Sequence, residues 1–368
     1  MITVKRIFIC LCALFMLSPL AIGVNALDTS AKSAILIDAG SGAVLYEKNA
    51  DERLSMASTT KIMTALVALE SGDIDREVTV PREAVGVEGT SVCLKEGEIL
   101  TLRELLYAMM LESANDAAAA IAVAVGGSIE DFALMMNEKA ESLGLADTSF
   151  ENPHGLDGEN HYTTARNLAT LAAHALENPD FCDLVSTYKK SIPYGEGGSR
   201  YLLNHNKMLK MYDGAIGVKT GFTKKSGRCL VSAAERDGMT LVAVTLSCPD
   251  DWRDHRAMLD YGFDNYEYRR LIADGEMEFY LECVGADSNV TVSNCGDVYA
   301  LMKKSEDTPK VSISLPRFVY APVEAGEVIG KVVFTSGDRV LGESVLAVTV
   351  SQGAKVYKKS LFEKIFGQ

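Results

Sequence analysis

The chain has 368 residues, of which 48% are hydrophobic and 23% are charged. This length favours two domains, and the apolar content excludes a mainly disordered protein. The sequence carries 36 Lys and Arg against 50 Asp and Glu, a net charge of −14, and this acidity disfavours a nucleic-acid-binding protein. No stretch of roughly 18 or more apolar residues follows the N-terminal segment, which excludes a multi-span membrane protein.

The N-terminus has the pattern of a secretory signal peptide, residues 1–26. Lys5 and Arg6 precede an uncharged apolar run, and Val24-Asn25-Ala26 places small side chains where a signal peptidase cleaves. The alternative is an uncleaved anchor, because the run approaches spanning length. Both predict export to the extracytoplasmic face of the membrane or the cell wall. Cleavage after Ala26 leaves 368 − 26 = 342 residues and a net charge of 34 − 50 = −16.

Six cysteines remain in the mature chain: Cys93, Cys182, Cys229, Cys248, Cys283 and Cys295. An exported chain permits disulfides, but six cysteines are too few to form the framework of a fold of this length. No Cys-x-x-Cys pair occurs among them, so neither a metal knuckle nor a thioredoxin-type site is predicted. Cys283 and Cys295 are a candidate disulfide, with buried free thiols as the alternative.

Residues 27–273 read as a mixed domain with strands at both ends and helices between them. Runs at 33–38 and 43–48 form a hairpin pattern, and a helix from Ser58 to about residue 71 is apolar on every face and therefore buried. A capping box at Thr101 opens a helix to about residue 111. Further helices are predicted at 117–125, 128–143, 164–176 (ended by Pro179) and 252–265, and strands at 215–220, 229–235 and 241–246. This order predicts an α+β fold, an antiparallel sheet whose edge strands come from the two termini and which carries a helical lobe.

Residues 274–352 have a different pattern. Short β-rich runs alternate with Gly, Asp, Ser and Pro, which predicts a small all-β domain. In the tail, residues 353–368, four apolar residues from Leu361 to Phe366 share one face at helical spacing. The alternatives for this tail are peripheral membrane contact, assisted by its lysines, and a solvated end.

Ser58-Thr59-Thr60-Lys61 opens the buried helix, and its three-residue step places Ser58 and Lys61 on one face. A serine hydroxyl needs a base to act as a nucleophile, and a lysine removed from water can provide one. A second Ser-x-x-Lys match, from Ser186 to Lys189, does not head an apolar helix and is interpreted as a solvated strand or loop. The alternative for Ser58 is a plain helix N-cap.

Two further motifs have the chemistry to complete such a site. Ser113 and Asn115 lie in a break between apolar helices, where they are either helix caps or a proton shuttle and an amide-binding group. Lys219-Thr220-Gly221 lies on a strand, where the lysine supplies charge and the threonine a hydrogen bond to a carboxylate. Gly221 leaves the strand surface bare, so that an extended substrate can pair with the backbone. The alternative is an ordinary edge-strand turn.

In this order, the three motifs resemble those of the low-molecular-mass penicillin-binding proteins, the serine-type D-alanyl-D-alanine carboxypeptidases. The resemblance covers nearly all of the mature chain and includes Asn152-Pro153-His154-Gly155-Leu156 and Ala321-Pro322-Val323. It implies a β-lactamase/transpeptidase-like domain followed by a small β domain. It also implies peptidoglycan stem peptides ending in D-Ala-D-Ala as substrates, β-lactams as covalent inhibitors, and no cofactor.

The resemblance further implies the catalytic roles. Ser58 attacks the carbonyl between the two D-alanines and is acylated, and Lys61 accepts its proton. Ser113 and Lys219 complete the relay to the leaving D-alanine.

It implies binding roles for four more positions. Thr220, within Lys219-Thr220-Gly221, holds the terminal carboxylate, and Asn115 holds the amide on the acyl side. The backbone N–H groups of Ser58 and Phe222 form the oxyanion hole.

One position departs from the family pattern. Several relatives place an arginine shortly before Lys-Thr-Gly, where this chain has Asn204-His205-Asn206, so His205 is a candidate replacement. His154 and His161 match no metal-ligand spacing, and no metal is predicted.

Three alternative functions stay open. A class A-like β-lactamase would carry a Glu-x-x-Leu-Asn segment, which is absent between the second and third motifs, and would leave the β domain unexplained. A β-lactam-acylated receptor would carry a transmembrane signalling region. The third alternative is a cell-wall scaffold with little turnover.

Overall fold

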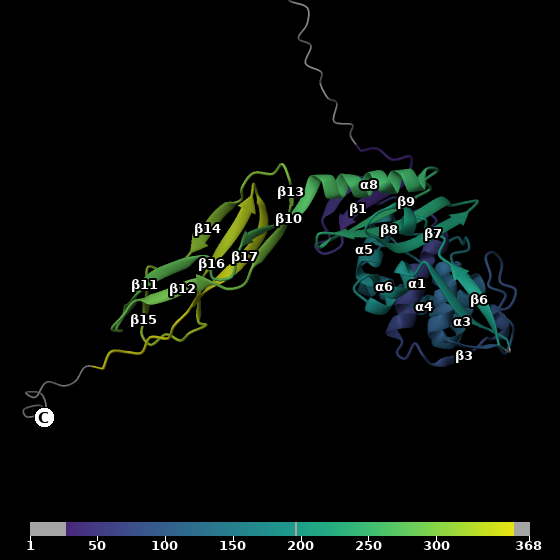
Figure 1. The fold of residues 1–368 in the computed structure, drawn as a ribbon, viewed down its shortest axis with the longest axis horizontal. Helices are drawn as coiled ribbons and strands as arrows, with labels where there is room; N and C mark the ends of the chain where they lie inside the picture. The colour runs from purple at the N-terminus through teal and green to yellow at the C-terminus, as the bar shows by residue number, and fades with distance from the viewer. Residues whose placement is uncertain (1–26, 196, 357–368) are drawn as a thin grey trace, which may run out of the picture.

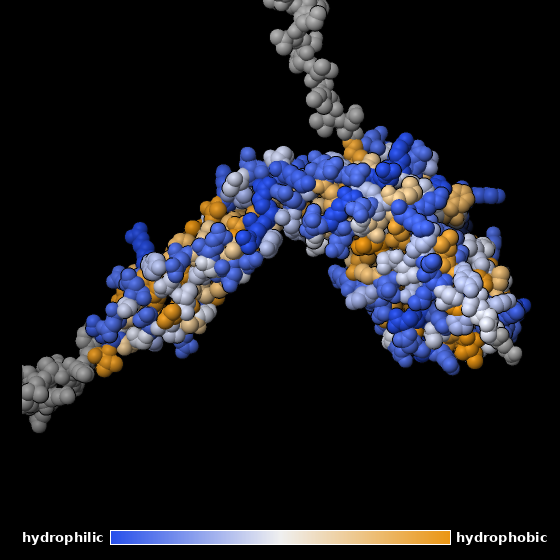
Figure 2. Space-filling model, viewed as in Figure 1, coloured by the Kyte–Doolittle hydropathy of each residue, from blue (hydrophilic) through white to orange (hydrophobic). Residues whose placement is uncertain are grey.

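The structure is a computed structural model and describes residues 27–195 and 197–356. A larger mixed domain and a smaller β domain are joined where helix α8 (Asp251–Asn265) runs directly into strand β10 (Tyr266–Ile272) (Figure 1). Figure 2 shows mostly hydrophilic side chains over α8 and this junction. The predicted signal peptide, residues 1–26, and the apolar face of the predicted tail lie outside the described residues.

A five-stranded antiparallel sheet forms the centre of the larger domain, in the order β2-β1-β9-β8-β7. Its strands are β1 (Ser33–Asp38), β2 (Val44–Lys48), β7 (Ala215–Thr223), β8 (Gly227–Arg236) and β9 (Met239–Leu246). The predicted strands are confirmed. The sheet does combine both ends of the domain, but its first and last strands, β1 and β9, pair in the middle, and β2 and β7 form the edges.

Helices cover both faces of this sheet, which is why β1 and β9 are buried along nearly their whole length. α8 packs on one face, and α5 and α6 pack on the other face, on the side of the helical lobe (Figure 1). The helices are α1 (Lys61–Glu70), α2 (Leu102–Leu111), α3 (Asn115–Gly126), α4 (Ile129–Ser142), α5 (Ala165–Ala175), α6 (Pro179–Ser186), the short α7 (Met208–Met211) and α8.

α1 runs through the middle of the lobe and contacts α2 to α6. Every residue from Lys61 to Leu69 is buried, which confirms the prediction of a helix enclosed on all sides. The capping box of α2 is also confirmed, since Thr101 Oγ1 accepts from the Glu104 N–H at 3.2 Å and Glu104 Oε2 accepts from the Thr101 N–H at 2.8 Å. α1 follows the turn that carries Ser58, the candidate nucleophile, and α2 precedes the break that carries Ser113 and Asn115.

The prediction that Pro179 ends a helix is wrong. α5 ends at Ala175, and Pro179 is the first residue of α6, which the sequence analysis missed. Asn178 caps this helix, with its Oδ1 accepting from the Asp180 N–H at 2.9 Å. Proline fits this position because the first N–H groups of a helix have no partner within it. The hairpins β3 (Glu77–Thr79) with β4 (Ile99–Thr101) and β5 (Lys189–Tyr194) with β6 (Gly198–Leu203) were also missed.

The smaller domain is all β over the residues that the structure describes, as predicted. Its six-stranded sheet has the order β14-β16-β17-β12-β11-β15, and β10 forms a separate pair with β13. The strands after β10 are β11 (Glu278–Val284), β12 (Val290–Asn294), β13 (Val298–Lys303), β14 (Lys310–Ser314), β15 (Phe318–Tyr320), β16 (Val328–Ser336) and β17 (Arg339–Val348). All six cysteines in the described part of the chain are free thiols, so the buried Cys283 and the exposed Cys295 do not form the candidate disulfide.

Candidate active site

Ser58 lies on a short 3₁₀ turn, Ala57–Thr60, which leads directly into α1. The turn is held by hydroxyl groups, because Thr59 Oγ1 donates to the Met56 carbonyl at 2.6 Å and Thr60 Oγ1 donates to the Ala57 carbonyl at 2.8 Å. Ala57 has a positive φ of 49°, a strained conformation that reorients the backbone just before Ser58. The Ser58 side chain makes no capping hydrogen bond, so the N-cap alternative does not describe it.

Lys61 is fully buried one turn after Ser58. Its Nζ lies 3.1 Å from Ser58 Oγ, 2.7 Å from Asn115 Oδ1 and 2.6 Å from the carbonyl oxygen of His154. Burial, reinforced by the positive charge of Lys219, holds the pKa of this amine well below its ordinary value of 10.5. Since both carbonyl-type oxygens can only accept, a neutral amine donates its two N–H bonds to them and turns its lone pair to the Ser58 hydroxyl.

Ser113 and Asn115 occupy the break between α2 and α3. Ser113 has a positive φ of 62°, lines the cleft, and its hydroxyl has no hydrogen-bond partner among the residues described. Asn115 is buried and donates from Nδ2 to the Glu88 carbonyl at 2.6 Å while its Oδ1 faces Lys61. The N-cap of α3 is Ala114, without a side-chain bond, so these polar residues are not helix caps.

Asp116 organises the loop beside this break, a role that the sequence analysis did not foresee. It is buried, and its carboxylate accepts from Ser91 Oγ at 2.6 Å and from the Leu94 and Val92 N–H groups at 3.0 and 3.2 Å. Thr90, at the start of this loop, lines the cleft. An acidic residue directly after a polar break was the only sequence signal for this support.

Lys219, Thr220 and Gly221 lie on β7, the sheet edge that faces the nucleophile. A Cβ added to Gly221 would lie 3.0 Å from the Ser58 nitrogen, so this glycine permits the close approach of the strand. Lys219 is buried, its Nζ donates to the Thr220 carbonyl at 3.1 Å, and burial lowers its pKa to about 7. The next residue, Phe222, has a side chain that is 66% exposed at the mouth of the site.

The segment 152–161 closes the other side of the nucleophile. Gly155 packs so tightly on the turn that an added Cβ would lie 2.0 Å from the Ala57 carbonyl oxygen. His161 accepts from the Glu151 N–H at Nδ1 and contacts Thr60 Oγ1 at 2.8 Å through Nε2. Burial lowers the pKa of His154 to about 3 and of His161 to about 4, so both rings are neutral at pH 7. No group of three or more possible metal ligands occurs in the described part of the chain.

These segments meet at a cleft of about 330 Å³. Its lining consists of Ser58, Thr90, Ser113, His205, Thr220, Gly221, Phe222, Arg228, Asp251 and Trp252. The predicted serines therefore share one cleft with Thr220, Gly221 and Phe222. Lys61 and Asn115 lie directly behind Ser58, and the buried Lys219 does not line the cleft. Arg228, Asp251 and Trp252 were not predicted. Arg228 reaches the cleft through the register of the β7–β8 hairpin, which places it opposite Phe222.

A family model described as D-alanyl-D-alanine carboxypeptidase matches residues 21–250, and one described as the C-terminal domain of penicillin-binding protein 5 matches residues 266–359. The chain belongs to the D-alanyl-D-alanine carboxypeptidase family. The resemblance seen in the motifs is thereby confirmed. The second family model begins with β10, which pairs with β13 of the smaller domain.

Individual members of the family align over most of this chain. D-alanyl-D-alanine carboxypeptidase DacF of Bacillus subtilis is 34% identical over 328 residues, 86% of this chain and 84% of that protein. DacC of Escherichia coli is 30% identical over 361 residues, 91% of this chain and 88% of that protein. The crystal structure of penicillin binding protein 5 from Haemophilus influenzae has a TM-score of 0.72 at 28% identity, covering 90% of this chain and 100% of that one.

The family match also bears on the alternatives. A class A-like β-lactamase is not favoured, because both domains match carboxypeptidase-type family models in the expected order. His205, the candidate replacement for the missing arginine, does line the cleft. Its Nε2 lies 3.2 Å from Glu112 Oε2, so this ring already has a carboxylate partner within the protein.

Proposed function

We propose that this D-alanyl-D-alanine carboxypeptidase cleaves the terminal D-alanine from peptidoglycan stem peptides through an acyl-enzyme on Ser58. The observation that supports this most directly is the 3.1 Å separation of Ser58 Oγ and Lys61 Nζ at the base of the cleft. Burial holds the pKa of the Lys61 amine well below its ordinary value, which makes the neutral form more accessible, and a neutral amine is a base.

In acylation, Ser58 Oγ attacks the carbonyl carbon between the two D-alanines, and the hydroxyl proton passes to Lys61 Nζ. The carbonyl oxygen becomes an oxyanion, which the backbone N–H groups of Ser58 and Phe222 stabilise. The C–N bond then breaks, and the proton held by Lys61 passes by way of Ser113 and Lys219 to the leaving nitrogen, which returns Lys61 to its neutral form. D-alanine departs, and the rest of the peptide is an ester of Ser58.

In deacylation, a water molecule attacks the ester carbonyl, giving its proton to Lys61. The C–O bond to Ser58 breaks, the Ser58 oxygen regains a proton, and the shortened peptide leaves with a new carboxylate.

Asn115 holds the amide on the acyl side, since Nδ2 keeps one N–H free of the Glu88 carbonyl. A β-lactam acylates the same serine, and its opened ring stays attached because no amine leaves the site.

The experiment that tests this proposal uses the mature chain, residues 27–368. With a peptide ending in D-Ala-D-Ala we expect free D-alanine, measured by amino-acid analysis. With penicillin we expect a stable adduct, mapped by mass spectrometry to the tryptic peptide that contains Ser58. An adduct elsewhere, or no D-alanine release, would overturn the proposal. Rapid hydrolysis of penicillin without an adduct would instead support the β-lactamase alternative.

The proposal also covers where the protein acts and how its two ends contribute to that location. The substrate lies outside the cytoplasmic membrane, so we propose that residues 1–26 direct export and are cleaved after Ala26, and that residues 353–368 contact the membrane peripherally. Among the described residues no single helix is long and apolar enough to span a membrane; α3 and α4 reach that length and composition only together, with an 81° bend between them. N-terminal sequencing of the protein recovered from producing cells is expected to begin at Leu27; a start at Met1 would favour the uncleaved anchor.

A further inference from the structure

One arginine lines the cleft from β8, the strand next to β7. Arg228 is the second residue of β8 and lies directly opposite Phe222 in the β7–β8 register. Opposite residues of an antiparallel pair share a face, and so do residues two apart on one strand. Arg228, Phe222 and Thr220 therefore share one face of the sheet, and all three line the cleft.

The guanidinium of Arg228 is held in a fixed direction. Its Nε and Nη2 donate to the two carboxylate oxygens of Asp251 at 3.0 and 2.9 Å. The Asp251 side chain is only 5% exposed, whereas that of Arg228 is 44% exposed. Nη1 has no hydrogen-bond partner among the described residues, so this edge of the fork stays available to a ligand.

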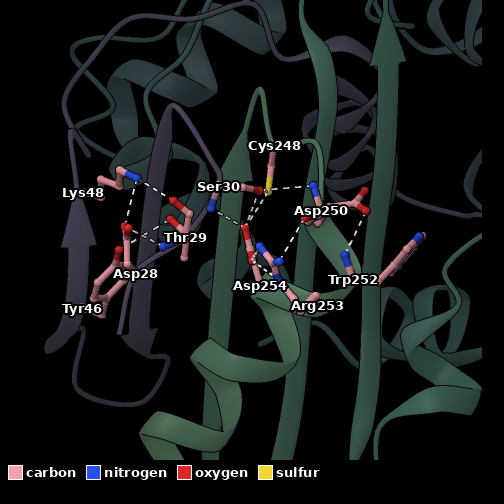
Figure 3. Close-up of polar contacts among 11 residues, drawn as sticks. Asp28, Thr29, Ser30, Tyr46, Lys48, Cys248, Asp250, Trp252, Arg253 and Asp254 are labelled. Carbon is pink, nitrogen blue, oxygen red and sulfur yellow. Dashed lines mark hydrogen bonds and ion pairs between the residues drawn. The ribbon is translucent and has the colours of Figure 1, made fainter. Parts of the chain in front are cut away.

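Asp251 is itself anchored, because the first turn of α8 is tied to Ser30, which lies just before β1. Ser30 donates from its N–H and Oγ to Asp254 Oδ2 at 2.6 and 2.7 Å, and its Oγ accepts from the Asp250 N–H at 3.2 Å (Figure 3). Cys248 Sγ donates to the same Asp254 oxygen at 3.3 Å. This network fixes the turn that presents Asp251 and Trp252 to Arg228.

The other cations near the site are already occupied or enclosed. Arg200 donates to both carboxylate oxygens of Glu98 and to the Val92 carbonyl, and its side chain is 9% exposed. Lys219 is 2% exposed and does not line the cleft. His205 faces Glu112. Among the described lining residues, Arg228 is thus the one permanently charged cation.

We propose that Arg228 binds the free C-terminal carboxylate of the peptide substrate, together with the Thr220 hydroxyl, and so sets the preference for a free C-terminus. Arginine suits this role because its planar fork can hold Asp251 with one edge and donate to a carboxylate with the other. Asp251 is the positioning residue. The proposal rests on the proposed function. In the sequence analysis Lys219 supplied the positive charge for the substrate carboxylate; here Arg228 supplies it.

The test compares two peptides, one ending in a D-Ala-D-Ala acid and the other in the corresponding amide. We expect Arg228→Gln to lower kcat/KM about 10- to 100-fold on the acid, the effect of one charge-assisted hydrogen bond, and less than about 3-fold on the amide. Arg228→Lys is expected to recover part of the loss on the acid. The matched control is Arg236→Gln, at the other end of β8, where the side chain donates to the Asp213 carbonyl; it should leave both peptides unchanged.

Arg228→Gln leaves the buried Asp251 without its partner, so the double variant Arg228→Gln/Asp251→Asn, which removes both charges, is measured beside it. It is expected to show the same acid-selective loss. Equal losses on acid and amide in the double variant, or no loss on the acid, would overturn the proposal. Penicillin labelling of Ser58 in the wild type separates this failure from failure of the proposed function, since labelling requires the nucleophile and not the acid preference.

Discussion

Ser58→Ala is expected to abolish D-alanine release, by at least about 10⁴-fold, because removal of a nucleophile leaves only substrate positioning and the oxyanion donors. The fold should be unaffected. The Ser58 hydroxyl has Lys61 as its partner, and Lys61 keeps the Asn115 and His154 oxygens in the variant. D-alanine release and penicilloyl adduct formation are both measured, and both should vanish together.

The chain provides a matched control in its second Ser-x-x-Lys sequence. Ser186 ends α6, where its Oγ donates to the Cys182 carbonyl at 2.6 Å, and Lys189 is exposed at the start of β5. Ser186→Ala should therefore retain full activity and labelling. Turnover by Ser58→Ala at the wild-type rate, or loss of turnover in Ser186→Ala, would show that the nucleophile lies elsewhere.

Lys219→Met is expected to make the catalytic domain more stable while it removes most of the activity. Burial lowers the pKa of Lys219 from 10.5 to about 7, a difference of 3.5 that corresponds to roughly 5 kcal/mol of unfavourable desolvation, at about 1.36 kcal/mol per pKa unit. The only hydrogen bond that its Nζ makes among the described residues is to the Thr220 carbonyl. A methionine, which has a similar length, therefore loses one hydrogen bond and keeps most of the packing. We expect the substitution to recover a substantial part of this energy.

The stability gain from Lys219→Met is expected to depend on pH, because burial lowers the pKa of Lys219 in the folded state. The folded-state pKa lies below the unfolded one, so between about pH 7 and 10.5 the unfolded chain binds more protons, and wild-type stability rises with pH. The gain from Lys219→Met should be largest below pH 7 and shrink toward pH 10.5. Trp252, the single tryptophan of the chain, reports unfolding of this domain by fluorescence. Lys224→Met, an exposed lysine on the same hairpin, is the control; a gain of equal size there, or one independent of pH, would contradict this account.

The parts of the site that were predictable are those encoded over one turn or one strand. Helical spacing placed Lys61 next to Ser58, and an entirely apolar helix predicted the burial that lowers the lysine pKa. The strand bearing Thr220 was likewise evident from its composition. α6 was missed because a proline marks the end of one helix and the first position of another equally well, and only Asn178 before it separates the two cases.

What could not be predicted is how segments far apart in the chain converge. The sequence does not distinguish Gly155 from other loop glycines, and only the structure shows that it packs against the Ala57 carbonyl. Asp116 looks like part of a motif until its carboxylate is seen to hold the loop at residues 91–94. Arg228 reaches the cleft only because β8 pairs with β7 in one register and because α8 places Asp251 beside it. Residue periodicity contains the local geometry of each element but not these long-range contacts.

The pairing of β1 with β9 has a consequence for the order in which the domain assembles. β2 follows β1 directly in the chain, but Ser33 of β1 lies opposite Leu246 of β9, so more than two hundred further residues must be synthesised before the second partner strand of β1 exists. Until then both apolar faces of β1 lack the packing that buries them in the folded domain, so the incomplete chain is prone to aggregation. Covalent labelling by a β-lactam would therefore detect only fully folded molecules, and the rate at which labelled protein appears would measure how fast the enzyme matures.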